Sequence, residues 1–325
     1  MFVIVVAWNG AELIQRCLES LLNQHNLREH TVCVVDNAST DNTLQVVREL
    51  SSRFKEKGIS FELIQSQDNL GYTGGANLGL RSVLERGASD EDLAVVLNQD
   101  VEVHSGWVDA LQEVSERIPD LGAVGCLALY PDGELIQHAG AKLEMPRMVA
   151  HHIAYHQRNV PLNEQEVDFV SGMAIGLKIG ALRKVGLFDE VFSPGYYEDA
   201  EICVRMRRHG FRVVFSPRAR VTHLETQSFS DLRHRLVLSH RNRIIFALNY
   251  FEGQAIDSFF DAESQYISAD AHPDECVMLA SAYLLALAHL SRQEPLLLSK
   301  YPVNSYRRRR LLELRKQCIR KALAL

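Results

Sequence analysis

Short apolar runs alternate with amphipathic segments along the first hundred residues. The runs are rich in β-branched side chains and cover residues 2–7, 31–35, 60–65 and 93–97. Between them, apolar residues return at the spacing of one helix face, as do Leu13, Cys17, Leu18, Leu21 and Leu22. Alternating strands and helices form a parallel sheet covered by helices, and its strands are apolar throughout because both faces are buried. The pattern therefore predicts an α/β fold with a mostly parallel sheet and helices on both faces.

The rhythm changes after about residue 120. We expect a turn at 131–133 and a long loop or lid over 141–167. We also expect strands over 121–129, 212–215 and 219–223, and helices over 178–185 and 199–209. The acidic stretch 252–275 is typical of a linker or exposed loop, and 276–292 is typical of an apolar helix. These features predict a catalytic domain over 1–245 and a C-terminal helical extension over 246–325.

Charge, cysteine spacing and the lengths of the apolar runs disfavour several classes of protein. The net charge of -6 and the pI near 6.1 differ from the basic character of most nucleic-acid binders. The six cysteines form no CxxC pair, so neither a disulfide framework nor a zinc site is expected. The apolar start, residues 1–7, lacks a basic leader and is too short to span a bilayer. No other apolar run reaches about 18 residues, which predicts a cytoplasmic protein.

Each of the first four predicted strands ends in a polar loop. The loops are Trp8-Asn9-Gly10, Asp36 to Asp41, Asn69 to Asn77, and Asn98-Gln99-Asp100. Ligands of an open parallel sheet bind at the carboxyl ends of its strands. Ordinary caps and turns account for any one of these loops, but the four together favour a binding edge.

Two carboxylates in these loops suit a nucleotide ligand. Asp36 could accept hydrogen bonds from a nucleobase imide or a ribose hydroxyl, while Ser39 or Thr40 could cap the next helix. Asp100 follows a buried apolar strand, where a carboxylate could hold a hard divalent cation. Such a cation would neutralise the charge of a departing diphosphate.

The glycine-rich segment 69–79 does not follow the GxGxxG pattern, and the loop after the first strand holds Trp8-Asn9-Gly10 instead. This counts against a nicotinamide-dependent dehydrogenase. The glycines would let the backbone approach a ligand or simply make turns. Asn69 and Asn77 offer amides to a base or to the loop itself.

Further chemistry lies near residue 200. Glu198, Asp199 and Glu201 open a predicted helix, where a carboxylate is stabilised by roughly 0.3–1 kcal/mol if exposed. Such a group could accept a proton from an acceptor hydroxyl, and the preceding Tyr196-Tyr197 could form a flat wall for a sugar ring. His223 ends a short strand. A lone histidine is more often a packed structural residue, but its neutral imidazole could complete a metal shell with Asp100.

In series, these segments resemble the family 2 glycosyltransferases with the GT-A (Rossmann-like) fold, especially their rhamnosyltransferase-like branch. The resemblance covers residues 2 to about 245. It rests on Val5 to Asn9, Val35 to Asp41, Asn69 to Tyr72, Gly74 to Asn77, Leu97 to Asp100, Val170 to Gly172, Gly186 to Glu190, Glu198-Asp199 and His223.

The resemblance implies an inverting, metal-dependent transferase. It would move a sugar, with rhamnose as the leading candidate, from a UDP- or dTDP-sugar to a hydroxyl of a glycan or lipid-linked acceptor in cell-surface polysaccharide or glycolipid synthesis. Asp199, paired with Glu198, would be the base, and Asp100 and His223 would hold Mg²⁺ or Mn²⁺. Tyr196, Tyr197 and Gly172 would line the acceptor and sugar pocket. The nucleotide-sugar would contact Ala7, Asn9, Asp36, Asn69, Gly71, Gly74, Asn77, Asn98, Gln99 and Asp100.

The sequence departs from the family pattern twice. Asn98 replaces the first acid of the DxD-type motif, which removes one charge from the metal site, and Glu201 stands where many relatives have aspartate.

Two rival functions stay open. A sugar-phosphate nucleotidyltransferase would show a basic glycine-rich loop after the first strand, which is absent. A non-catalytic nucleotide- or sugar-binding relative gains support from Asn98, but Asp100, Asp199 and His223 oppose it.

The C-terminal segment 301–325 carries eight cations and one acid, a net charge of +7. Apolar residues are interleaved with the charges: Leu311, Leu312, Leu314, Ile319, Leu323 and Leu325. A basic amphipathic helix can lie on an anionic membrane, which would make this a peripheral protein at the inner face of the membrane. A solvated terminal helix or tail is the equal alternative.

Overall fold

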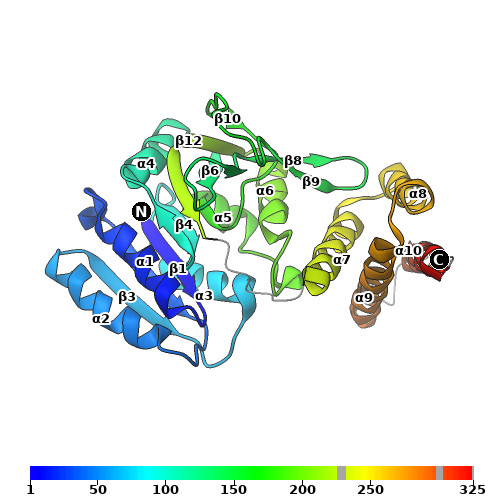
Figure 1. The fold of residues 1–325 in the computed structure, drawn as a ribbon, viewed down its shortest axis with the longest axis horizontal. Helices are drawn as coiled ribbons and strands as arrows, with labels where there is room; N and C mark the ends of the chain where they lie inside the picture. Colours follow the sequence, from blue (N-terminus) through cyan, green and yellow to red (C-terminus); the bar gives the residue numbers. More distant parts are fainter. Residues whose placement is uncertain (225–231, 298–302, 324–325) are drawn as a thin grey trace. The chain divides into compact units, whose positions relative to one another are not determined.

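The predicted alternation of strands and helices builds one large sheet in the computed structural model, which describes residues 1–224, 232–297 and 303–323 (Figure 1). The sheet has the order β10-β12-β6-β11-β4-β1-β2-β3, and β5 and β7 pair with β12 and β6. Parallel pairing joins β1 (Phe2–Ala7), β2 (Thr31–Asp36), β3 (Ser60–Gln65) and β4 (Leu93–Asn98). The prediction of a mostly parallel sheet in this half is confirmed.

The second half of the sheet mixes directions. β11 (Ala174–Lys178) runs antiparallel between β4 and β6 (Leu121–Leu129), whereas β6 pairs in parallel with β12 (Arg212–His223). The other strands are short: β5 (Val101–Val103), β7 (Ile136–His138) and β10 (Gln165–Glu166). Because β11 starts beside the end of β4, the loop before β11 joins the binding edge of the parallel strands.

Helices cover the sheet through the stripes that the sequence predicts. They are α1 (Ala11–Leu22), α2 (Thr43–Glu56), α3 (Gly71–Glu85), α4 (Trp107–Arg117), α5 (Ile179–Val185) and α6 (Glu198–Arg208), with short 3₁₀ turns at Leu27–Glu29 and Glu190–Phe192. On α1, the buried face holds Ile14, Cys17, Leu18, Leu21 and Leu22. Full burial of each leucine contributes roughly 1.5–3 kcal/mol relative to exposure.

The expectation of a glycine-rich loop over 69–79 is wrong beyond its first two residues, because α3 begins at Gly71. A Cβ atom on Gly79 would lie 2.4 Å from Ile4 Cγ2, and one on Gly75 would lie 2.8 Å from Val6 Cγ1. These glycines therefore allow α3 to pack closely on β1, which outweighs their low helix propensity.

Two other expectations need correction. The segment 141–167 is not a continuous loop, because it contains the hairpin β8 (Ala141–Glu144) and β9 (Val149–His152) and the short β10. The two strands expected at 212–215 and 219–223 are one strand, β12, with an irregularity between Ser216 and Arg220. Pro217 lies within that irregularity and has no N–H to donate, which explains the break in pairing.

The chain divides into two compact units. The first comprises Met1–Lys142 and His151–Thr226, and the second comprises Leu143–Ala150 and Gln227–Leu325. The division falls before α7 (Leu232–Tyr250), earlier than the boundary expected at 245, because α7 packs against α9 of the second unit. The hairpin tip, 143–150, also belongs to the second unit, which the sequence did not indicate.

The second unit is helical. Besides α7 it contains α8 (Gln254–Ala269), α9 (Pro273–Leu297) and α10 (Val303–Leu323). The linker expected over 252–275 is wrong, because α8 buries Ile256, Phe259, Phe260 and Ile267 at helical spacing. Its many acids concealed that stripe. Residues Pro273–Ser291 of α9 are long and apolar enough to cross a membrane, a property that buried helices of globular proteins share.

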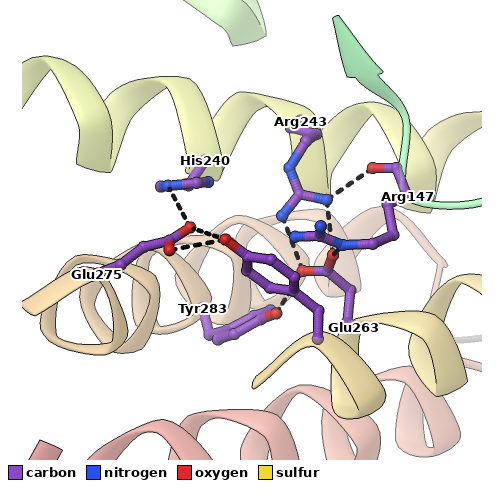
Figure 2. Close-up of polar contacts among 7 residues, drawn as sticks. Arg147, His240, Arg243, Glu263, Glu275 and Tyr283 are labelled. Carbon is purple, nitrogen blue, oxygen red and sulfur yellow. Dashed lines mark hydrogen bonds and ion pairs between the residues drawn. The ribbon is translucent and has the colours of Figure 1, made fainter. Parts of the chain in front are cut away.

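A buried ionic cluster holds the second unit together (Figure 2). The Glu263 carboxylate accepts two hydrogen bonds from Arg243, at 2.9 and 2.8 Å, one from Arg147 at 2.6 Å and one from the Tyr283 hydroxyl at 2.6 Å. Burial alone would raise the pKa of Glu263, but the two guanidinium groups outweigh it and lower the pKa to about 2. Arg147 comes from the hairpin tip, so this cluster ties residues 143–150 to α7, α8 and α9.

We expect Glu263→Gln to lower the free energy of unfolding by about 3–5 kcal/mol, because two buried guanidinium groups would lose their counter-charge. Urea unfolding followed by circular dichroism measures the change. The matched control is Asp261→Asn on the same helix, whose ion pair with Arg310 is exposed on the acid side and should contribute less than about 1 kcal/mol. Equal losses in the two variants would contradict the prediction.

Candidate active site

Asp36 ends β2 at the carboxyl edge of the sheet, between Ala7 of β1 and Gln65 of β3. Its side chain is buried, and its Oδ1 atom has no hydrogen-bond partner within the described part of the chain. A buried polar atom normally finds a partner. Asp36 therefore offers an acceptor that suits a ligand donor, such as a nucleobase imide or a ribose hydroxyl.

Asn37, which the sequence analysis missed, shapes the loop next to Asp36. Its Nδ2 donates to Gly71 O at 2.9 Å and to Asn69 Oδ1 at 3.0 Å, and its Oδ1 accepts from Leu70 N–H at 2.9 Å. The same Asn69 Oδ1 accepts from Gly71 N–H at 2.9 Å. The amide oxygen of Asn69 is thus used within the loop, and Asn69 and Gly71 act on the site through backbone position.

Asn77 has a different task from the one expected. Its amide oxygen accepts from Phe188 N–H at 3.0 Å, and its Nδ2 donates to Phe188 O at 2.9 Å and to Glu190 Oε1 at 3.2 Å. The residue is buried, so these contacts join α3 to the 186–190 segment. Gly74 is also buried inside α3, where a Cβ atom would lie 2.6 Å from Leu70 Cβ. We therefore leave both residues out of the proposed donor contacts.

The loop after β1 is tied to the loop after β4. Gln99 Oε1 accepts from Trp8 N–H at 3.0 Å, and Gln99 Nε2 donates to Trp8 O at 2.7 Å. Asn9 has a positive φ of 44°, and its Oδ1 accepts from Thr40 N–H at 2.7 Å. Gln99 and Asn9 therefore fix the backbone around Trp8, which is 38% exposed at this edge.

Asp100 and His223 form the core of a candidate metal centre. The β5–β12 ladder pairs His223 with Val101, which brings His223 Nε2 within 3.3 Å of Asp100 Oδ1. On its other side, His223 Nδ1 lies 2.8 Å from Gln137 Oε1, an acceptor, so Nδ1 carries the proton in the neutral ring. The Nε2 lone pair then faces the Asp100 carboxylate. Two lone pairs at this distance repel unless a proton or a metal ion lies between them.

The donor set fits a divalent cation. A carboxylate and an imidazole both ligate Mn²⁺, and a carboxylate suits Mg²⁺. No cluster of three or more His, Cys, Asp and Glu side chains occurs among the described residues, so diphosphate oxygens and water would supply the remaining ligands. Asn98, half-buried at the end of β4, is two residues from Asp100, which places its carbonyl oxygen at the same edge.

Glu198 and Asp199 open α6 after two strained residues. Tyr196 and Tyr197 adopt positive φ angles of 77° and 69°, a conformation that is uncommon for residues other than glycine. The Asp199 carboxylate accepts from Gly172 N–H at 2.9 Å and from Ala200 N–H at 2.7 Å. Burial nevertheless raises its pKa, which brings a carboxylate closer to the range of an effective general base.

Gly172 connects Glu198 and Asp199 to the end of β4, where Asn98 and Asp100 lie. The neighbouring Met173 O accepts from Asn98 N–H at 2.9 Å, while Gly172 itself binds Asp199. The Tyr72 hydroxyl donates to Gly172 O at 2.5 Å, and a Cβ atom on Gly172 would lie 3.0 Å from the Tyr72 oxygen. Tyr72 and Gly172 thus link the start of α3, the loop before β11 and the acids of α6.

His138, which no sequence signal indicated, supports the same loop from behind. Its Nε2 accepts from Ser171 N–H at 3.1 Å, so its proton lies on Nδ1, 2.7 Å from His152 Nδ1. Burial, and then the charge of His152, hold the pKa of His138 well below its usual value. A neutral His138 is the form that can accept from Ser171.

Glu201 and Arg205 have a structural role beside the site. Glu201 binds Arg205 through two hydrogen bonds, at 2.9 and 2.7 Å, and Arg205 also donates to Val185 O and Leu187 O. Glu201 therefore orients the Arg205 guanidinium, which in turn fixes the backbone of the 185–188 segment.

Replacing Glu198 by glutamine should stabilise the protein. Burial, and then the charge of Asp199, raise the pKa of Glu198 well above 4.5, and among the described residues its buried Oε2 has no hydrogen-bond partner. Above pH 4.5 the unfolded chain loses this proton first, so the wild-type protein loses stability as the pH rises toward the folded-state pKa. The melting temperature of Glu198→Gln should exceed that of wild type by an amount that grows from pH 5 to pH 8. A constant or shrinking difference would refute this assignment.

The chain is similar in sequence to known proteins. The chain is 27% identical over 269 residues to N-acetylglucosaminyl-diphospho-decaprenol L-rhamnosyltransferase of Mycobacterium tuberculosis, covering 77% of this chain and 85% of that protein.

Solved structures show the same fold at low identity. A mannosyltransferase from Pyrobaculum calidifontis in complex with GDP-Man and Mn²⁺ matches with a TM-score of 0.56 and 18% identity, over 99% of this chain and 86% of that one. TarS of S. aureus in complex with UDP-GlcNAc matches with a TM-score of 0.56 and 16% identity, over 99% and 88%. Residues 1–239 match the family described as glycosyltransferase like family 2. The chain therefore belongs to glycosyltransferase family 2 and is a glycosyltransferase with the GT-A fold.

Proposed function

We propose that this protein is an inverting, metal-dependent transferase that moves a sugar from a UDP- or dTDP-sugar to an acceptor hydroxyl. The observation that carries the proposal is the convergence, at one sheet edge, of the opposed Asp100–His223 pair and the half-buried Asp199 carboxylate. Asp100 follows β4 and His223 ends β12, while Asp199 accepts a hydrogen bond from Gly172, whose neighbour Met173 bonds to the end of β4. One group suits the leaving diphosphate and the other suits the attacking hydroxyl.

The base chemistry follows from the Asp199 environment. Two backbone N–H groups fix both carboxylate oxygens, so the group is oriented before a substrate arrives. A raised pKa improves its ability to take the proton of the acceptor hydroxyl as the new glycosidic bond forms. Glu198, with its pKa raised further, is protonated over a wider pH range and therefore leaves Asp199 as the acceptor of that proton.

Donor binding falls to the loops after β1, β2 and β4. Asp36 would accept from the base or the ribose, and Trp8 and Asn9 lie on the neighbouring loop. Asp100 and His223 would hold Mn²⁺ or Mg²⁺, which when bound neutralises the diphosphate as it leaves. Asn98 would add a neutral oxygen, so the metal affinity should be lower than with two acids.

The relatives suggest the sugar and the acceptor. The mycobacterial relative is a rhamnosyltransferase whose name gives a lipid-linked acceptor, and another relative from Myxococcus xanthus is an O-antigen biosynthesis protein. We therefore favour rhamnose as the sugar and a lipid-linked glycan as the acceptor, in cell-surface polysaccharide synthesis. Such an acceptor would place the protein at the inner face of the membrane.

A thermal-shift screen against UDP, dTDP, GDP and ADP, each with and without Mn²⁺, tests the donor site. A nucleotide at about 100 times its Kd should stabilise by roughly 2.7 kcal/mol. We expect a metal-dependent shift with dTDP or UDP that is lost in Asp100→Ala.

Asp199→Asn should keep that shift but lower kcat for transfer about 10²–10⁴-fold. Full transfer by Asp199→Asn would exclude Asp199 as the base, and a folded wild type that binds none of these nucleotides would favour a non-catalytic relative.

His138 should influence turnover through the Ser171–Gly172 loop. His138→Leu leaves Ser171 N–H without its acceptor, and we expect kcat to fall about tenfold with little change in the donor KM. His138→Gln is the matched control, because its amide oxygen can take the place of Nε2 and should restore most of kcat. If His138→Leu stays folded with wild-type kcat, or if both variants lose kcat equally, the assignment is wrong.

A further inference from the structure

The α9–α10 helix pair exposes an apolar surface that faces solvent. On α9, Val277, Leu284 and Leu285 are 56%, 50% and 42% exposed, and Leu312 on α10 is 44% exposed. Val277, Ser281, Leu284, Leu285 and Ala288 follow the spacing of one helix face, while Cys276, Leu279, Tyr283 and Ala286 on the opposite face are buried. The stretch from Cys276 to Ser291 contains no Asp, Glu, Lys or Arg.

Two contacts fix how the two helices run. Arg308 near the start of α10 donates to Ser291 Oγ at 3.0 Å near the end of the apolar stretch of α9, and the thiols of Cys276, near the start of α9, and Cys318, near the end of α10, are close enough to affect each other's pKa. The helices are therefore antiparallel, and interpolation between the two contacts places Leu284 at about the level of Leu312 and Val277 at about the level of Ile319. We name Val277, Leu284, Leu285, Ala288, Leu312 and Ile319 the α9–α10 patch.

Cations on α10 border this patch. Arg308, Leu312, Arg315, Lys316 and Ile319 share one face of the helix by their spacing; Lys316 is exposed, whereas Arg308 and Arg315 are half-buried, each with a buried Nε atom. Other basic side chains of α10 point inward: Arg307 donates to Leu248 O and Phe251 O, and Lys321 donates to Ser268 O. Leu311 and Leu314 are buried as well. The sequence left open a membrane-lying amphipathic helix and a solvated terminal helix or tail; in the structure α10 is neither wholly free nor wholly solvated, because it packs against the other helices of its unit. Leu325 lies outside the described residues.

We propose that the α9–α10 patch binds the surface of an anionic phospholipid bilayer. Apolar side chains bordered by cations fit a surface where phosphate headgroups lie above acyl chains. A second copy of the chain fits less well, because a symmetric contact would bring two strongly cationic helices together. The proposal rests on the proposed function in one respect: membrane binding would bring the enzyme to a lipid-linked acceptor.

Vesicle flotation of the full chain tests this proposal. Wild type should float with vesicles of three parts phosphatidylcholine and one part phosphatidylglycerol, and at least tenfold less with phosphatidylcholine alone. Leu284→Glu/Leu285→Glu should lower binding to the anionic vesicles at least tenfold, and Arg315→Gln/Lys316→Gln should lower it severalfold. The matched control is Leu232→Glu on α7, which changes a leucine that is still more exposed, at 63%, and should float like wild type.

Further measurements separate the outcomes. Leu284→Ser/Leu285→Ser introduces no charge and should also lose binding, and an unchanged melting temperature shows that each variant is folded. Nucleotide thermal shifts should be the same in wild type and variants, so failure of the donor site is distinguishable from failure of the patch. Wild-type flotation of the glutamate variant would overturn the proposal. A second result would also overturn it: wild type does not float with vesicles, and light scattering shows that wild type is a dimer which the Leu284→Glu/Leu285→Glu variant does not form.

Discussion

Buried acidic side chains at one edge of the sheet are the constraint on which the rest of this site depends. Asp36 ends β2, Asp100 follows β4, and Glu198 and Asp199 open α6, where Asp199 binds the loop before β11; all are buried except Asp199, which is half-buried. A buried carboxylate without a partner is costly, so such a group raises its pKa, gathers backbone N–H donors or awaits a ligand. All three responses occur here: a raised pKa at Glu198, two amide donors at Asp199, and an open acceptor at Asp36.

The second unit shows the opposite solution to the same problem. Glu263 is as deeply buried, yet Arg147, Arg243 and Tyr283 satisfy both of its oxygens and lower its pKa to about 2. That carboxylate has no capacity left for a ligand and can only stabilise the fold. Burial therefore does not distinguish the structural carboxylate of Glu263 from the carboxylates of the candidate active site. Their hydrogen-bond and ion-pair partners do.

The active-site loops depend on one another more than on their own helices and strands. Gln99 binds Trp8, Asn37 binds the loop that precedes α3, and Gly172 binds both Tyr72 and Asp199. His138 supports Ser171 from a strand that carries no motif. A substitution in any of these linking residues changes the position of groups that it never touches, so much of the site is specified by amides and glycines.

The sequence by itself determined the alternation of strands and helices, the α1 stripe, and the residues at the strand ends, because hydrophobic periodicity and turn chemistry are local. It also suggested the family, since the motifs occur in a fixed order. Only the tertiary structure decided what those residues do. Long-range pairing between β5 and β12 sets His223 against Asp100, close packing on β1 makes the glycine-rich segment a helix, and Asn77 turns inward. The α8 helix and the ionic cluster escaped the sequence for the same reason: charges that look solvated in one segment find their partners in another, far along the chain.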